Sequence, residues 1–62
     1  MKSTTFTFTL DYPKALALAQ FVKRCGWVDL IQNAASKEEA ERMGQALYVL
    51  QKAMAEKGFA PR

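Results

Sequence analysis

A chain of 62 residues with one cysteine and no histidine has few ways to stabilise a fold. A domain this short buries only about 60% of the surface of its unfolded chain, so small domains commonly rely on disulfides, a metal ion or a partner chain. Cys25 has no second cysteine to pair with, and a zinc site needs several cysteine or histidine ligands. We therefore expect a single small domain over residues 1–62 that holds no cofactor and forms a homodimer.

The composition is that of an ordinary folded protein, since 50% of the residues are hydrophobic and 24% are charged. The longest apolar-rich stretch, residues 15–22, is too short to span a bilayer. No apolar run follows Lys2, so we expect no signal peptide. A lone cysteine without an export signal is typical of a reducing compartment. We expect a soluble cytoplasmic protein without a membrane role.

Within residues 4–10, threonine alternates with phenylalanine or leucine. This period of two predicts a half-buried strand. No other segment alternates for long and no hairpin turn is present, so the strand lacks a partner within the chain. We expect two copies to pair as an antiparallel intermolecular ribbon; the alternative is a segment that lies on the helices through its phenylalanines. The face packed on the helices would carry Phe6, Phe8 and Leu10, and the outer face Thr5, Thr7 and Thr9.

Two helices are expected after the strand. Pro13 predicts the start of a helix that runs to about Cys25, with Asp11 as its N-cap and Gly26 as a left-handed stop. A short helical turn should follow within residues 27–34. The predicted inward stripe of the first of these helices consists of Leu18, Phe21, Val22 and Cys25, with Ala15 at its edge.

A long third helix is predicted from Lys37 to Lys57. Ser36 and Glu39 form a capping box before it, and Gly58 provides its stop. The expected fold is therefore α+β and mostly helical, in the order strand, helix, short helix, helix. A narrow seam on the long helix packs either within the chain or across a dimer, and consists of Ala40, Met43, Leu47, Leu50 and Met54.

The sequence offers no arrangement typical of catalysis. General acid–base chemistry at neutral pH most often uses histidine, which is absent. Glu38, Glu39 and Glu41 are explained by the dipole at the start of a helix rather than by a metal or acid–base role. Cys25 has no accompanying base and is interpreted as a small buried hydrophobe rather than a nucleophile. We predict that the protein is not an enzyme and has no small-molecule substrate.

Two groups of residues are candidates for binding. The outer threonines, Thr5, Thr7 and Thr9, could contact a partner, or could form a solvated strand face. Lys23, Arg24 and Trp27 combine cations with an aromatic ring and could hold phosphate or an acidic protein surface, or could be a solvated face beside a core tryptophan. Lys2 could add a further cation. The net charge of +3 is compatible with nucleic acid or an acidic protein. Outside the predicted stripes lie three further apolar residues, Leu16, Tyr48 and Val49.

The order of strand, proline-initiated helix, glycine turn and second helix over residues 6–31 resembles that of ribbon–helix–helix repressors. The resemblance implies a dimer whose ribbon enters the major groove of DNA, with Thr5, Thr7 and Thr9 near the bases. That family more often carries arginine, lysine, glutamine or asparagine at the outer positions, and the long third helix has no counterpart in it. A DNA-binding regulator is therefore the alternative hypothesis.

Three short stretches are similar to a group of small bacterial proteins of unknown function found in proteobacterial genomes and mobile elements. They are residues 17–24 (ALAQFVKR), the pair Gly26 and Trp27, and residues 58–62 (GFAPR). The resemblance brings no known function. By analogy, short proteins of phages and plasmids often act by binding and blocking a host protein. The favoured hypothesis is a non-enzymatic protein that binds another protein.

Overall fold

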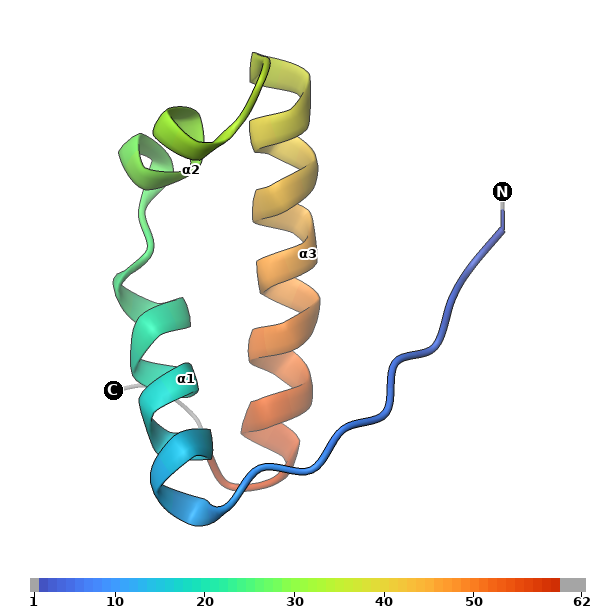
Figure 1. Ribbon diagram of the computed structural model, residues 1–62, viewed down its shortest axis with the longest axis vertical. Coiled ribbons are helices and arrows are strands. Elements are labelled where there is room, and N and C mark those ends of the chain that lie inside the picture. The colour runs from blue at the N-terminus through green and yellow to red at the C-terminus, as the bar shows by residue number, and fades with distance from the viewer. Residues whose placement is uncertain (1, 60–62) are drawn as a thin grey trace.

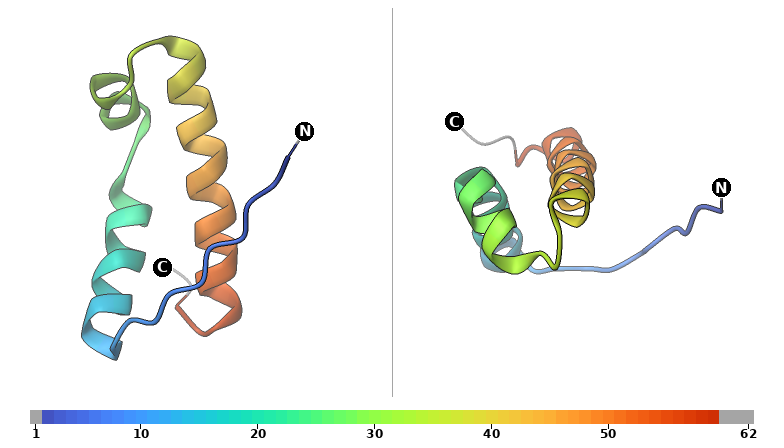
Figure 2. Two further views of the ribbon diagram at one scale, coloured as in Figure 1. Left: turned by 45° about the vertical axis from the view of Figure 1, so that its right-hand side comes forward. Right: turned by 90° about the horizontal axis from the view of Figure 1, so that it is seen from above.

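The computed structural model describes residues 2–59, which form three helices and an extended N-terminal arm (Figure 1). The helices are α1 (Tyr12–Arg24), α2 (Trp27–Asn33) and α3 (Lys37–Glu56). α1 and α3 run side by side in opposite directions, and α2 lies at one end of the pair, between them in sequence (Figure 1). The arm, residues 2–10, leaves the start of α1, passes α3 and then points away from the helices (Figure 2).

The expected α+β fold is wrong, because residues 2–59 contain no strand. All of residues 2–10 are exposed, and no hydrogen bond to their backbone is found within the described part of the chain. A single extended segment cannot pair its own amides and carbonyls, so without a second strand they stay hydrated. The predicted intermolecular ribbon is therefore wrong as well, since it requires this strand. The alternative, a segment that lies on the helices through its phenylalanines, agrees better with the structure, because Phe6 and Phe8 line a groove together with residues of α3. Their side chains are nevertheless 81% and 62% exposed.

The N-terminus of α1 is capped as the sequence predicts. The Asp11 carboxylate accepts a hydrogen bond from the backbone N–H of Lys14 at 3.1 Å. Gly26, in contrast, is not a left-handed stop, since its φ is −101°. The chain turns directly into α2 there, so Gly26 serves as the N-cap of α2 and donates its N–H to the carboxylate of Asp29 at 2.9 Å.

Both ends of α3 form as predicted. The Ser36 hydroxyl accepts from the backbone N–H of Glu39 at 3.1 Å, while the Glu39 carboxylate accepts from the N–H of Ala35 at 2.7 Å, one residue earlier than in the standard capping box. At the other end Gly58 has φ of +91°. The N–H groups of Gly58 and Phe59 donate to carbonyls of the last helical turn, each at 3.0 Å, as in a Schellman motif.

The core within residues 2–59 is small. Only Ala19, Val22 and Ala40 are buried, and Ala40 is the one with no exposed surface. The predicted stripe of α1 was partly wrong, because Phe21 is 63% exposed and Ala19 takes the inward position. The helix is therefore rotated relative to the prediction, so that a small alanine rather than the larger Phe21 ring faces the other helices. Around the core lie half-buried side chains, including Leu18, Cys25, Leu30, Met43, Leu47, Leu50 and Met54.

Gly44 lies within α3, where a glycine costs roughly 0.5–1 kcal/mol relative to alanine. A Cβ at this position would lie 3.4 Å from Leu30 Cδ1 of α2, which is an ordinary van der Waals contact. We therefore expect Gly44→Ala to raise the free energy of unfolding by about 0.5–1 kcal/mol in a urea titration. An unchanged or lower stability would contradict this packing of α2 on α3.

Candidate functional site

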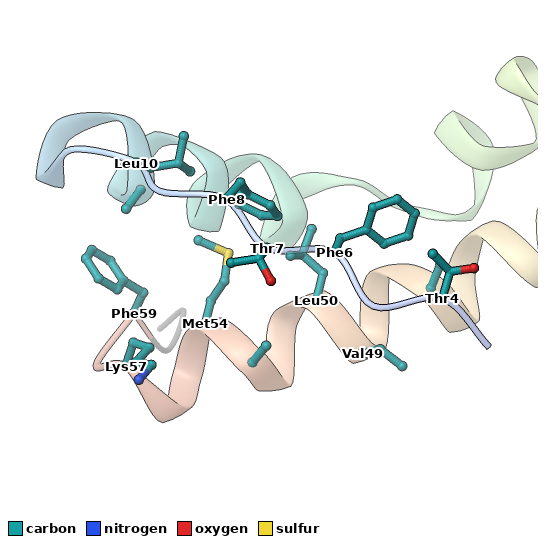
Figure 3. Close-up of a pocket in the computed structure, with 13 residues that line it drawn as sticks. Thr4, Phe6, Thr7, Phe8, Leu10, Val49, Leu50, Met54, Lys57 and Phe59 are labelled. Atoms are coloured by element: carbon teal, nitrogen blue, oxygen red, sulfur yellow. The ribbon is translucent and has the colours of Figure 1, made fainter.

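A concave apolar groove lies between the arm, the start of α1 and the second half of α3 (Figure 3). We call it the arm groove. Its volume is about 830 Å³ and it is open to solvent. Such an apolar concavity is the usual starting point for a binding-site hypothesis. It is lined by Thr4, Phe6, Thr7, Phe8, Leu10, Ala15, Ala46, Val49, Leu50, Ala53, Met54, Lys57 and Phe59.

Three elements shape the arm groove. The arm contributes the rings of Phe6 and Phe8, and the side chains of Leu50 and Met54 project from α3 toward the arm (Figure 3). Phe59 lies at the end of the groove nearest the start of α1. Its ring packs on that of Tyr12 with 5.4 Å between the centroids and an interplanar angle of 48°.

The two predicted faces of the arm do not separate in the structure. Thr7 lines the arm groove together with the apolar residues of the arm, whereas Thr5 and Thr9 do not line it. Lys2 is exposed. The outer face expected to contact a partner is therefore divided, and the structure does not bring its threonines together with Lys23, Arg24 or Trp27 at either concave surface.

A second, smaller hollow of about 290 Å³ lies between α1, α2 and α3, and we call it the Trp27 hollow. The Trp27 side chain is 48% exposed, so it is not a core tryptophan. The Tyr48 ring shares the hollow and is 62% exposed. Lys52 Nζ lies 5.7 Å from the centroid of that ring, at a cation–π distance. The lining residues are Val22, Cys25, Gly26, Trp27, Leu30, Gly44, Leu47, Tyr48 and Gln51.

The predicted cations lie next to this hollow in the sequence. Lys23 and Arg24 are exposed in the last turn of α1, between Val22 and Cys25, which both line the hollow. Within residues 2–59 the ion pair found is Lys14 with Asp11, so neither cation is neutralised by a described carboxylate.

Two residues of this face were not predicted as contacts. Tyr48 was recognised as lying outside the apolar stripe of its helix and, with Leu16 and Val49, as a weak indication of a further interface, whereas Lys52 was missed as a contact. Their spacing of four residues on one helix was the available signal.

The carboxylates and the cysteine considered for chemistry lie in separate parts of the structure. The Glu39 carboxylate is engaged at the start of α3, and Glu38 and Glu41 are exposed beside it. Cys25 is a free, half-buried cysteine in the wall of the Trp27 hollow. No group of three or more acidic, cysteine or histidine residues that could hold a metal ion occurs within residues 2–59. Over the same residues, no helix combines the length and apolarity needed to cross a membrane.

Comparison with known proteins yields a family but no function. No curated protein and no solved structure matches the chain. The profile of a family of unknown function, DUF7706, matches residues 1–62. This match agrees with the resemblance to short proteins of unknown function, although it does not test the particular stretches on which that resemblance rests. Because the match covers the whole chain, the protein belongs to this family of unknown function, DUF7706.

Proposed function

We propose that this protein is a non-enzymatic binding protein, and that the Trp27 hollow and its basic surroundings recognise an acidic segment of a protein partner that also carries apolar side chains. The observation that carries the proposal is the exposure of two aromatic rings, Trp27 and Tyr48, in one hollow. Lys52 Nζ lies 5.7 Å from the centroid of the Tyr48 ring. Lys23 and Arg24 are exposed, come directly before the lining residue Cys25 in the sequence and form no ion pair among residues 2–59.

The residue types favour a protein over DNA. Tryptophan, tyrosine and arginine contribute most of the binding energy in protein–protein interfaces, and they act where water is excluded. Specific protein–DNA interfaces are much more positively charged, and their affinity depends on neutralising several phosphates. A net charge of +3 provides little of that field. The ribbon–helix–helix hypothesis is not carried forward, because the structure has no strand within residues 2–59.

A cationic and aromatic face selects its partner by charge as well as by shape. Basic residues around the hollow attract acidic surfaces and repel basic ones, which favours one class of partner during encounter. The partner could be a host protein that is blocked on behalf of a phage or plasmid, and the support for that finer role is the sequence resemblance alone.

The test compares the capture of proteins from the native host by immobilised wild-type protein and by variants. Trp27→Ala should lose the specific partner, and the affinity for the purified partner should fall at least roughly thirtyfold, since a central aromatic contact is commonly worth 2 kcal/mol or more. Tyr48→Ala should weaken binding in the same direction, and the variant should stay folded because the Tyr48 side chain is exposed.

The matched control is Val28→Ala, which truncates an exposed side chain, 65% exposed, next to Trp27 but outside the hollow. This variant should bind like the wild type. Equal binding by all four proteins would refute the proposal. So would sub-micromolar binding of duplex DNA at physiological salt, because non-specific contacts reach only about 10⁻⁴–10⁻⁶ M.

A further inference from the structure

We infer that the arm groove is the contact surface of a homodimer, in which Phe6 and Phe8 of one copy insert into the groove of the other. The inference concerns a different face from the Trp27 hollow and does not depend on the proposed function. It involves side-chain packing between the arm of one copy and α3 of the other, and no pairing of strands.

The first argument is the amount of surface that the chain leaves exposed. Its accessible surface is 5454 Å², whereas a compact monomer of 7.0 kDa exposes about 4,000 Å². The radius of gyration is 12.6 Å, against about 10.6 Å for a compact domain of this length. The excess of roughly 1,400 Å² exceeds the ~800 Å² that each partner loses in an interface of standard size, and lies in the range of homodimers.

The second argument is that the surface can complement itself. In a twofold symmetric dimer the same patch must both project and receive. The rings of Phe6 and Phe8 project, being 81% and 62% exposed. The wall formed by α3 receives, because Ala46 and Ala53 leave space on either side of Val49. Two copies facing each other would therefore fill each other's grooves with phenylalanine rings.

The third argument is charge. The chain carries +3, so two copies repel each other wherever basic faces meet. Lys57 is the one charged residue that lines the arm groove, so a second copy adds only one further like charge to this face. A face that is almost entirely apolar also lacks the charges that would select a different protein of opposite charge. A second copy also supports a core that consists of only three buried side chains within the described residues.

The experiment uses two matched substitutions. Val49 and Val28 are both helical valines and are 67% and 65% exposed, but Val49 alone of the two lines the arm groove. Wild-type protein should sediment at twice the 7.0 kDa monomer mass. Val49→Glu should weaken dimerisation roughly a hundredfold, because the symmetric interface contains the substitution twice and each copy costs about tenfold. Val28→Glu should leave the dimer unchanged.

Insertion of the arm is read directly by nuclear Overhauser effects between isotope-labelled and unlabelled chains in a mixed sample. We expect contacts between the Phe8 ring of one chain and the Val49 methyl groups of the other. A protein that stays monomeric at about 100 μM would overturn the inference, because a specific dimer with a dissociation constant of about 1 μM would be mostly assembled at that concentration. A dimer that Val28→Glu dissociates and Val49→Glu does not would overturn it as well. In either case binding through Trp27 can persist, so the two proposals fail separately.

Discussion

Ala40→Glu is expected to remove about half or more of the stability of the protein. Ala40 has no exposed surface, so a larger side chain overpacks the contact of α3 with its neighbours and its carboxylate has no described partner there. Together these effects should cost about 4 kcal/mol or more. A domain of 62 residues has a total stability of only about 3–9 kcal/mol, at 0.05–0.15 kcal/mol per residue. Loss of the helical circular dichroism signal on heating is the measurement.

The control for this prediction is Ala55→Glu, an exposed position near the end of the same helix. Glutamate is unfavourable at the end of a helix and favourable near its start, so the helix dipole acts against the control and for Ala40→Glu. The control should nevertheless lose no more than about 1 kcal/mol. A cooperative melt of Ala40→Glu at the wild-type temperature would show that α3 does not pack through this residue.

Gly58→Val is expected to lower the free energy of unfolding by about 2 kcal/mol. Gly58 has φ of +91°, a region that costs a residue with a Cβ about 1–2 kcal/mol and a β-branched residue at least as much. Among the described residues, apart from those next to Gly58 in the chain, no atom lies within 4 Å of the place a Cβ would take, so the cost comes from the backbone and not from a clash. For a domain of this size the melting temperature should fall by about 15 °C.

The matched control is Gly26→Val. Gly26 has φ of −101°, which valine adopts readily, so this variant should change the stability by less than about 1 kcal/mol. The two glycines look alike in the sequence, as each follows a predicted helix. Equal losses for the two variants would contradict the backbone conformations described above.

The features that the sequence predicts correctly are local. The caps by Asp11 and Ser36 and the turn at Gly58 each depend on a few neighbouring residues, and all three form. The limits of the three helices are also close to those predicted, because proline, capping residues and glycine mark helix ends. The Gly26 error shows where local reasoning stops: the same residue ends one helix or begins the next, depending on where the chain goes afterwards.

The features that the sequence does not predict depend on tertiary contacts. Alternation in residues 4–10 describes a segment suited to a strand, but a strand also requires a neighbour, and none is present within residues 2–59. In α1, Ala19 is buried and Phe21 is exposed because of how the helix is rotated against its neighbours, which periodicity alone does not reveal. The sequence does not predict the arm groove for the same two reasons: its position depends on an arm without a neighbouring strand and on which face of α3 is turned toward that arm.

The contact between Tyr12 and Phe59 has a consequence for the order in which the molecule folds. It joins the first residue of α1 to a residue just beyond α3, so it closes a loop of the chain that contains all three helices. Closing a loop of that length costs on the order of 3 kcal/mol of chain entropy, whereas α2 and α3 meet after a short turn. The aromatic contact should therefore form late, after the rate-limiting step. Interactions absent from that step slow unfolding without accelerating folding. Loss of the contact between the two aromatic rings should therefore raise the unfolding rate and leave the folding rate nearly unchanged.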